Sequence, residues 1–394
     1  MERIGIYGGT FNPPHLGHIQ GAKSAQAALH LDRLLLIPGC IAPHKAMPAD
    51  SASPGQRLEM LQLASREMEN TEVLDLEIRR QGKSYTYETV EQLQEQYPEA
   101  ERYLLMGTDM FLSFDSWKEP ERIARCAALA VLYRGEPGEA EAVARQKAAW
   151  EARGAKVTLV KNTVLEISST DLRRLIAFQC GDAFLHPEVS AYIQKERLYG
   201  AGADYRRLPM EQLEKVVCGL LKPNRVAHVL GCRDTAAALA RRYGADETDA
   251  ARAGLLHDVT KALDGSLQLT LCASYGTILD TFSQKNPKTL HALTGSLVAE
   301  RIFGENQAVV AAIRSHTTGK AHMNLLEKIL YVADYMEPNR NFPGVEALRE
   351  TAWQDIDKAL KMGLEMTLDM LREQGREIAP ESQQALAFLQ ELGV

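Results

Sequence analysis

The fold of the N-terminal half is decided by residues 4–18, which read IGIYGGTFNPPHLGH. The strand-forming residues Ile4 to Tyr7 run directly into the pair Gly8 and Gly9, and a helical pattern begins at about Ile19. Strand, glycine turn and helix in this order are typical of a parallel α/β sheet. Glycines let the backbone approach a ligand, and the free N–H groups of a helix start suit a phosphate. The segment therefore predicts an anion site at the end of the first strand.

The same alternation of strand and helix continues to about residue 200. Five further β-rich runs, separated by amphipathic helical stretches, are residues 34–37, 73–78, 103–106, 129–132 and 157–160. Because strands that alternate with helices form parallel sheets, we expect an α/β domain here.

The second half of the chain has a different pattern. From residue 210 to residue 394 helical patterns follow one another without a comparable strand, so we expect an all-α domain. Residues 198–205 are rich in Gly and Ala and can serve as a flexible joint. We therefore expect domains at 1–200 and 205–394, with the boundary near 202.

The composition is that of an ordinary folded protein. Its 394 residues suggest two domains at roughly 150 residues each. The chain is 45% hydrophobic and 25% charged, and its net charge of -7 leaves no broad basic surface for duplex DNA. No signal peptide and no run of about 18 apolar residues is present, so neither export nor membrane insertion is expected. The six scattered cysteines fit reduced thiols in a cytoplasm.

Two histidines follow the glycine turn and add chemistry to it. His15 and His18 are three residues apart, so their imidazoles can lie on the same side of the opening turn. A tight turn with two incidental histidines would give the same pattern, and a zinc pair would need further ligands. A second segment, residues 167–173 (ISSTDLR), starts another helix. Its hydroxyls and Arg173 form a second anion site or, more simply, a helix cap.

Together these segments closely resemble the bacterial nicotinate-mononucleotide adenylyltransferases of the nucleotidyltransferase superfamily, whose marks are H-x-G-H and I-S-S-T-x-x-R. The resemblance covers residues 1 to about 200 and implies a Rossmann-like parallel-sheet domain. Further matches, in the order that the family shows, are residues 43–45 (PHK), 84–89 (SYTYET), 107–109 (GTD) and Trp117. Asn12 departs from the pattern, because the family commonly has Asp there, and this change could weaken a contact near the phosphates.

The resemblance implies transfer of AMP from ATP to nicotinate mononucleotide, with magnesium accompanying the ATP. The nucleophile is an ionised phosphate, so the protein has to align the reactants and neutralise charge. The residues implied to hold ATP are Gly8, Gly9, Thr10, His15, His18, Ser168, Ser169 and Arg173. Those implied to hold the nicotinate ring are Thr86 and Trp117. The implied catalytic residues are His15, His18, Lys45 and Arg173.

In the all-α half, polar residues lie on apolar helix faces. His316 shares a face with Ile313, and Asp334 follows Leu330 at a four-residue step. The complete set is His228, His257, Asp258, His291, His316 and Asp334. Any one of the histidines alone is more simply a satisfied core residue. Because buried carboxylates without partners are costly, the set as a whole predicts a metal site.

The doublet His257-Asp258 resembles the namesake motif of the HD-domain metallohydrolases, which are all-α helical bundles. The segments 225–228, 257–261, 316–319 and 333–338 look like its YqeK-type branch, the symmetrical diadenosine tetraphosphate hydrolases. This resemblance, over about residues 205–390, implies that His228, His257, Asp258 and Asp334 hold one metal ion. Asp258 would bridge to a second ion held by His291 and His316. A mixed set of histidines and carboxylates suits two ions of iron, manganese or another first-row metal, among which the sequence does not choose, and iron is the metal that we expect.

Lys261 and Arg340 are candidates to bind a polyphosphate, Lys261 as a catalytic residue, although both could equally be solvated surface charges. The leading hypothesis is a bifunctional enzyme whose partners are ATP, nicotinate mononucleotide and diadenosine tetraphosphate, without nucleic acid or membrane. Alternatively, the helical half is a nucleotide-binding regulatory module, or it hydrolyses a different nucleotide. The sequence does not predict the oligomeric state.

Overall fold

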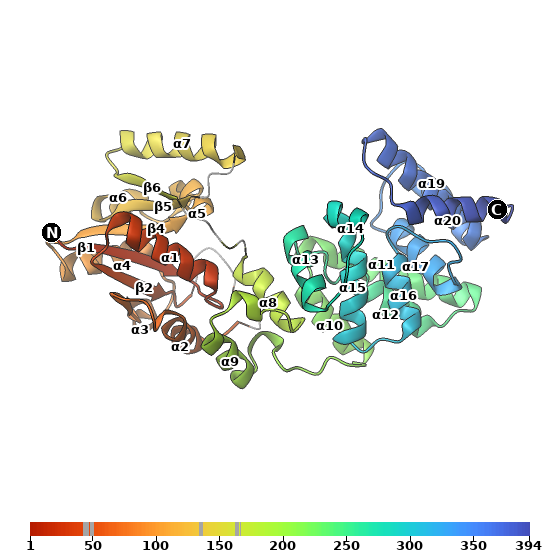
Figure 1. The fold of residues 1–394 in the computed structure, drawn as a ribbon, viewed down its shortest axis with the longest axis horizontal. Helices are drawn as coiled ribbons and strands as arrows, with labels where there is room; N and C mark the ends of the chain where they lie inside the picture. The colour runs from red at the N-terminus through yellow and green to blue at the C-terminus, as the bar shows by residue number, and fades with distance from the viewer. Residues whose placement is uncertain (42–46, 48–50, 134–136, 162–164, 166) are drawn as a thin grey trace. The chain divides into compact units, whose positions relative to one another are not determined.

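The computed structural model describes residues 1–41, 47, 51–133, 137–161, 165 and 167–394. The chain forms two compact units, Met1–Ala203 and Asp204–Val394, each with its own core (Figure 1). The first unit is a parallel α/β structure and the second is a helical bundle, so the predicted fold class is confirmed.

A six-stranded parallel sheet forms the centre of the first unit. Its strands are β1 (Arg3–Gly9), β2 (Arg33–Pro38), β3 (Thr71–Val73), β4 (Glu101–Gly107), β5 (Ala128–Tyr133) and β6 (Val157–Lys161), in the order β3-β2-β1-β4-β5-β6. Ile6 of β1 pairs with Leu35 on one side and with Leu104 on the other. The strand order reverses between β1 and β4, and ligands of such sheets bind at the carboxyl ends of the strands beside that point.

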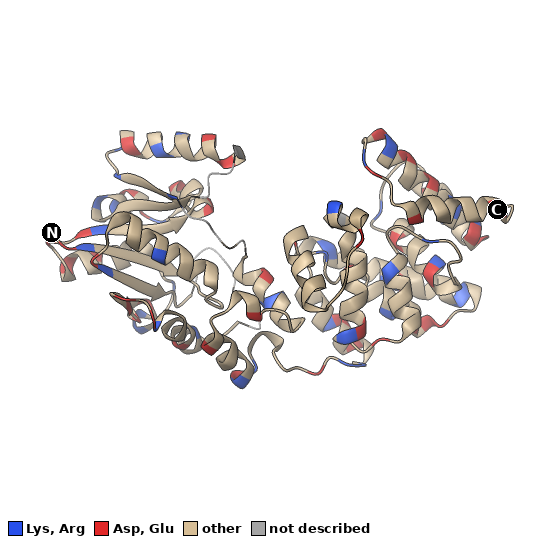
Figure 2. Cartoon of the chain, viewed as in Figure 1, with Lys and Arg blue, Asp and Glu red and all other residues tan. Residues whose placement is uncertain are grey.

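Helices cover both faces of this sheet, which explains why the strands are continuous apolar runs. One face packs Ile6, Leu104 and Val131 against helices that include Val90 and Trp150. The helices of the unit are α1 (Leu16–Leu29), α2 (Pro54–Ser65), α3 (Leu76–Arg80), α4 (Thr86–Gln96), α5 (Thr108–Leu112), α6 (Pro120–Cys126), α7 (Pro137–Ala152), α8 (Ser169–Ala177) and α9 (Pro187–Glu196). In Figure 2, α7 carries acidic residues toward both of its ends and basic residues between them.

Two sequence predictions differ from the structure in this unit. The strand predicted for residues 73–78 ends at Val73, and α3 begins at Leu76. Asp75 forms an ion pair with Arg79 one helical turn later, and the Glu77 carboxylate accepts a hydrogen bond from Thr89. These contacts favour a helix over an extended strand. Helix α1 begins at Leu16 rather than near Ile19, which places His18 in its first turn.

The stretch expected to be a flexible joint is partly a packed element. Residues Leu198–Gly200 form a 3₁₀ turn, and Tyr199 and Ala201 are buried in the first unit. The Tyr199 hydroxyl donates a hydrogen bond to Asn12 at 2.7 Å. The end of the first unit is therefore anchored to the turn that follows β1.

The second unit consists of helices, turns and loops. Its helices are α10 (Met210–Leu220), α11 (Pro223–Tyr243), α12 (Glu247–Leu256), α13 (Gly265–Ser274), α14 (Thr281–Lys285), α15 (Leu290–Arg301), α16 (Gln307–Ser315), α17 (Leu325–Met336), α18 (Val345–Ala352), α19 (Ile356–Glu373) and α20 (Pro380–Glu391). Helices α11, α12, α16 and α17 pack against one another, and α15 packs against α16. Among the described helices, none has the length and apolar character needed to span a bilayer.

Candidate functional site

His15 and His18 lie together at the start of α1, beside the end of β1. His15 occupies the N-cap position, and the two imidazole centroids are 3.6 Å apart. The backbone N–H of His15 donates to Nδ1 of His18 at 3.2 Å, so a neutral His18 carries its proton on Nε2. Burial lowers the pKa of His18 to about 4, and burial together with His18 lowers the pKa of His15 to about 2. Both rings are therefore neutral near pH 7, and His18 Nε2–H is a donor.

The start of α8 is joined to the turn after β1. Arg173 donates to the carbonyl oxygen of Asn12 at 2.8 Å, and the Ser169 hydroxyl donates to the carbonyl oxygen of Pro13 at 3.0 Å. The Ser168 hydroxyl accepts from the N–H of Asp171 and thereby caps α8. The two segments predicted from separate motifs thus meet, but both serine hydroxyls are engaged within the protein.

The glycine turn itself leaves room for a ligand. In the part of the chain that the structure describes, a β-carbon at Gly8 would meet no atom within 4 Å, whereas one at Gly9 would press against the Phe11 ring. The buried Arg57 donates to the carbonyl oxygens of Thr10, Gly39 and Cys40 at 2.6–2.8 Å. Arg57 therefore holds the turns after β1 and β2 together. The predicted catalytic residue Lys45 lies outside the described residues.

The two predicted ring-binding residues lie on neighbouring segments. Thr86 begins α4, and Trp117 follows α5 and stacks edge-on with Phe114 at 5.3 Å. The ammonium of Lys118 lies 4.2 Å above the Tyr85 ring, which brings the 84–87 segment beside the loop that carries Trp117. Both segments are half-buried or exposed. The first follows β3 and α3, and its Ser84 hydroxyl accepts a hydrogen bond from the N–H of Cys40, just after β2; the second follows β4. Both therefore lie at the carboxyl edge of the sheet, as His18 does.

In the second unit, the six predicted metal-binding residues converge around Asp258. Asp258 Oδ2 lies 3.6 Å from Nε2 of both His228 and His257. The other oxygen, Oδ1, lies 3.4 Å from His291 Nε2 and 3.9 Å from His316 Nε2. The two carboxylate oxygens therefore face two different pairs of histidines.

Asp334 completes the first of these groups. Its Oδ1 lies 3.2 Å from Nε2 of His228 and 3.8 Å from Nε2 of His257. Asp334 keeps 16% of its side chain exposed, whereas the other five residues are buried. The cluster is thus open on the side of Asp334.

Three of the histidines are oriented by hydrogen bonds at Nδ1, which leaves Nε2 for the cluster. His257 donates to the Gly254 carbonyl oxygen at 2.7 Å, and His316 donates to the Ile313 carbonyl oxygen at 2.6 Å. His228 faces the buried Glu337 carboxylate at 3.1 Å. Such outer partners are typical of histidines that bind metal. Burial lowers the pKa of His316 to about 4, so its Nε2 lone pair is available near pH 7.

Three cationic side chains surround the carboxylates. Arg225 contacts Asp258, Arg340 contacts Asp334, and Lys261 donates to His291 Nε2 at 2.8 Å. Burial alone would raise the pKa of Asp258, but His257, Lys261 and His291 hold it below its ordinary value. Burial would likewise raise the pKa of Asp334, and its hydrogen bond from His228 holds it well below.

The donor set fits a metal. His228, His257 and Asp334 form one group whose ligand atoms lie within 4.8 Å of one another, and His257, Asp258 and His316 form a second. Asp258 Oδ1 and His316 Nε2 are buried and have no hydrogen-bond partner among the described residues, and a cation between them would satisfy both. For His291 to bind metal through Nε2, the Lys261 ammonium has to move off that nitrogen.

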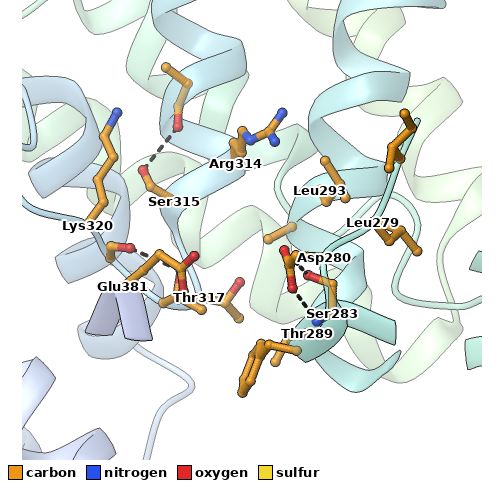
Figure 3. Close-up of a pocket in the computed structure, with 16 residues that line it drawn as sticks. Leu279, Asp280, Ser283, Thr289, Leu293, Arg314, Ser315, Thr317, Lys320 and Glu381 are labelled. Carbon is orange, nitrogen blue, oxygen red and sulfur yellow. Dashed lines mark hydrogen bonds between the residues drawn. The ribbon is translucent and has the colours of Figure 1, made fainter. Parts of the chain in front are cut away.

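Two cavities lie in the second unit. One, of about 290 Å³, is lined by sequence neighbours of His291 and His316 but by none of the six cluster residues, and Figure 3 shows Arg314 and Thr317 on one side of it and Asp280 on the other. The second, of about 640 Å³, is lined by Asp334 itself and runs from there to α19.

Known proteins resemble the two units separately. The family described as cytidylyltransferase-like matches residues 6–175. A "probable nicotinate-nucleotide adenylyltransferase" of Exiguobacterium sibiricum is 34% identical over 198 residues, which are 50% of this chain and 98% of the relative. Another from a Synechococcus strain is 38% identical over 202 residues, which are 50% of this chain and 95% of the relative. The chain belongs to the nicotinate-nucleotide adenylyltransferase family. The relatives match about half of the chain, which we call the adenylyltransferase-family domain.

The HD-domain family matches residues 225–339, a range that contains all six residues of the cluster. The second unit therefore carries an HD domain. A solved structure from Clostridium acetobutylicum, described as a "predicted HD superfamily hydrolase involved in NAD metabolism", is 35% identical. It covers 47% of this chain and 98% of its own length, with a TM-score of 0.46.

Two residues that organise these sites were missed by the sequence analysis. In the adenylyltransferase-family domain, Arg57 binds three backbone carbonyl oxygens from two turns. In the HD domain, Glu337 orients His228. Glu337 lies within the quoted segment 333–338, so an acidic residue three positions after Asp334 was an available signal. No spacing along the sequence points to Arg57.

Proposed function

We propose that the chain is a bifunctional enzyme. The adenylyltransferase-family domain transfers AMP from ATP to nicotinate mononucleotide and releases pyrophosphate, a step of NAD biosynthesis. The HD domain hydrolyses diadenosine tetraphosphate to two ADP.

For the transferase, the supporting observation is that His18 and Arg173 both contact the turn after β1, His18 at the Phe11 ring and Arg173 at the Asn12 carbonyl oxygen. His18 Nε2–H and the Arg173 guanidinium are both donors at this turn, which directly follows Gly8 and Gly9 of β1. Donors that are fixed before the reaction stabilise charge that develops on the α-phosphoryl oxygens. The nucleophile is a phosphate oxygen that is already ionised, so neutral His15 and His18 need not remove a proton from it. Magnesium bound to ATP would add charge neutralisation on the other phosphates.

Each nucleotide would be held by the backbone and side chains of one edge of the sheet. Gly8, Gly9 and Thr10 would line the triphosphate, with Ser168 and Ser169 fixing α8 so that its first N–H groups face the ligand. Thr86 and Trp117 would hold the nicotinate ring.

For the HD domain, the proposal rests on Asp258, because its two oxygens face two separate pairs of histidines. A carboxylate in this position can bridge two metal ions. His228, His257, Asp258 and Asp334 would hold one ion and Asp258, His291 and His316 the other, with iron or another first-row metal suited to these ligands. Bound metals would supply an activated water and brace the phosphate oxygens.

The residues of the chain itself favour a cut in the middle of the polyphosphate. Lys261 and Arg340 flank the cluster and would bind phosphates on either side of the one attacked. Attack at the centre of the chain gives two ADP. ATP and AMP would require the nucleophile to be displaced by one phosphate.

Product chromatography tests this proposal in the full-length protein. Diadenosine tetraphosphate should give ADP alone, chelation should stop the reaction, and Asp258→Ala should stop it while adenylyl transfer continues. Conversely, His18→Ala should abolish adenylyl transfer while hydrolysis continues. ATP plus AMP as the main products, or full hydrolysis after metal removal, would contradict the proposal. If a panel of nucleotides shows turnover of another substrate, or binding without turnover, the HD domain has one of the two alternative roles.

A further inference from the structure

The cavity beside Asp334 has a chemically divided lining. Asp334 and Arg340, which contact each other, lie at the cluster end of the cavity. Tyr335, Phe342 and Met366 line the remainder, and further lining residues come from α19. The Tyr335 and Phe342 rings meet edge to face with centroids 5.5 Å apart.

The rings are held in place by the surrounding structure. The Tyr335 hydroxyl shares a hydrogen bond of 2.7 Å with Thr367, and Tyr335 stacks on the buried Tyr331 with an interplanar angle of 5°. Phe342 is half-buried. The methionines Met366 and Met370 supply flexible apolar walls that adapt to a flat ligand.

The volume and the lining select the kind of ligand. About 640 Å³ lies within the range of small-molecule sites, which combine aromatic walls with a few polar groups. Asp369 and Glu373 also line this cavity and provide carboxylate acceptors for hydroxyl or amino groups. A nucleotide matches this lining in three ways. Its phosphate would lie at Asp334 and Arg340, its ribose hydroxyls at the carboxylates, and its aromatic base at the aromatic and methionine walls.

We propose that this cavity, between the end of α17 and α19, is the nucleoside subsite of the HD domain. It takes the purine base and ribose of a nucleotide whose phosphate lies at Asp334 and Arg340. This inference rests on the proposed function, because it assumes that a nucleotide phosphate reaches the cluster.

The 290 Å³ cavity of the second unit is less suited to this nucleoside. It has less than half the volume, and charged or hydroxyl side chains such as Arg314, Lys320 and Thr317 line much of it (Figure 3). The Thr317 hydroxyl is buried and finds no hydrogen-bond partner in residues 1–41, 47, 51–133, 137–161, 165 and 167–394. The carboxylates of Asp280 and Glu381 also line it and offset the two basic side chains, and none of the six cluster residues lines it, so it offers no place for a nucleoside whose phosphate lies at Asp334.

Two substitutions in the full-length protein test the subsite by steady-state kinetics. Phe342→Ala removes a stacking ring, and Met370→Trp fills the mouth of the cavity, where Met370 is 41% exposed. We expect each to raise the KM for diadenosine tetraphosphate about tenfold or more, because stacking on an aromatic ring contributes strongly to base binding. The inhibition constant of inorganic tripolyphosphate, which has no nucleoside, should stay within about twofold, since it needs only the phosphate positions.

Phe388→Ala and Leu392→Trp are matched controls on α20 and after it, away from the cavity lining, and should leave both constants unchanged. Equal KM values for the wild-type protein and both cavity variants would overturn the subsite while leaving the hydrolase intact. A parallel loss of tripolyphosphate binding would also overturn it, because the effect would then be structural.

A second measurement does not depend on hydrolysis. Photolabelling of the wild-type protein with 2-azido-ADP, followed by peptide mapping, should place a label within residues 335–373, and Met370→Trp should remove that label. Labelling confined to the adenylyltransferase-family domain would overturn the subsite. If the label is found but no nucleotide is hydrolysed, the subsite stands and the proposed hydrolase function fails.

Discussion

Gly231 of α11 lies against the carboxylate of Glu337, and a β-carbon at position 231 would overlap Glu337 Oε2. The same carboxylate accepts hydrogen bonds from the N–H of Asn339 at 2.7 Å and faces Nδ1 of His228 at 3.1 Å. Glu337 can therefore orient His228 only because residue 231 has no side chain.

Replacing Gly231 with Ala should displace Glu337 and release His228 from its fixed orientation. Loss of such an outer partner typically lowers metal affinity by about 10- to 100-fold. Metal content after dialysis against a graded chelator measures the change. Gly219→Ala on α10 is the matched control, because a β-carbon there meets no atom of the described residues within 4 Å. It should keep full metal affinity, and unchanged affinity in Gly231→Ala would contradict the role given to Glu337.

The low pKa of His18 predicts how stability depends on pH. Burial holds the pKa of His18 at about 4 in the folded protein, whereas an unfolded histidine titrates near 6.5. Above about pH 6.5 neither state is protonated, so the group contributes no pH dependence. Below that pH only the unfolded state gains the proton, so the free energy of unfolding falls by about 1 kcal/mol per pH unit down to about pH 4.

Urea unfolding of the wild-type protein and of His18→Gln over this pH range measures the effect. The variant should lose less stability on acidification than the wild-type protein does. The exposed His30 gives the matched control, His30→Gln. An identical acid slope in the wild-type protein and His18→Gln would show that His18 titrates normally.

Asn12 should tolerate Asp but not an apolar residue. Its Oδ1 accepts hydrogen bonds from the Tyr199 hydroxyl and the Ala52 N–H, and its amide donates to Ser51. Asn12→Leu removes all three bonds and should cost about 1–3 kcal/mol of stability. It should also lower kcat for adenylyl transfer, because loss of the side-chain anchors would shift residue 12 and with it the main-chain carbonyl oxygen that positions Arg173.

Asn12→Asp keeps both acceptor positions, and the Ser51 hydroxyl can turn to donate. We expect its free energy of unfolding to stay within about 1 kcal/mol of the wild-type value in urea titrations. If Asp destabilised the protein as much as Leu does, the amide donor would matter more than the acceptor.

The sequence predicted the strands that are buried on both faces. Runs such as residues 34–37 and 129–132 are apolar throughout, and only a central position in a covered sheet requires that. The run at 73–78 was misassigned because alternation over six residues does not separate a strand from a short helix. Contacts distant in sequence, such as that between Glu77 and Thr89, select the helix.

The same limit applies to the sites. Site residues that lie close together along the chain, such as His15 and His18, could be found from the sequence. Arg57 could not, because its function is to bind three carbonyl oxygens that only the folded chain brings together. The engagement of Lys261 with His291 likewise depends on the packing of two separate segments.

The start of α4 should make the transferase prefer the acid substrate over its amide. Thr86 is the first residue of this helix. The first N–H groups of a helix have no acceptor within the helix, and its N-terminus is the positive end of the helix dipole. The Lys118 ammonium, above the Tyr85 ring, adds positive charge to the same region. A nicotinate carboxylate is an acceptor that suits these donors, whereas the N–H groups of a carboxamide would face them as further donors.

We expect kcat/KM for nicotinate mononucleotide to exceed that for the amide by about tenfold or more. Thr86→Val should reduce this ratio, while Thr71→Val on the edge strand β3 should leave it unchanged. Equal kcat/KM for the two substrates in the wild-type protein would contradict the assignment of Thr86 to the ring site.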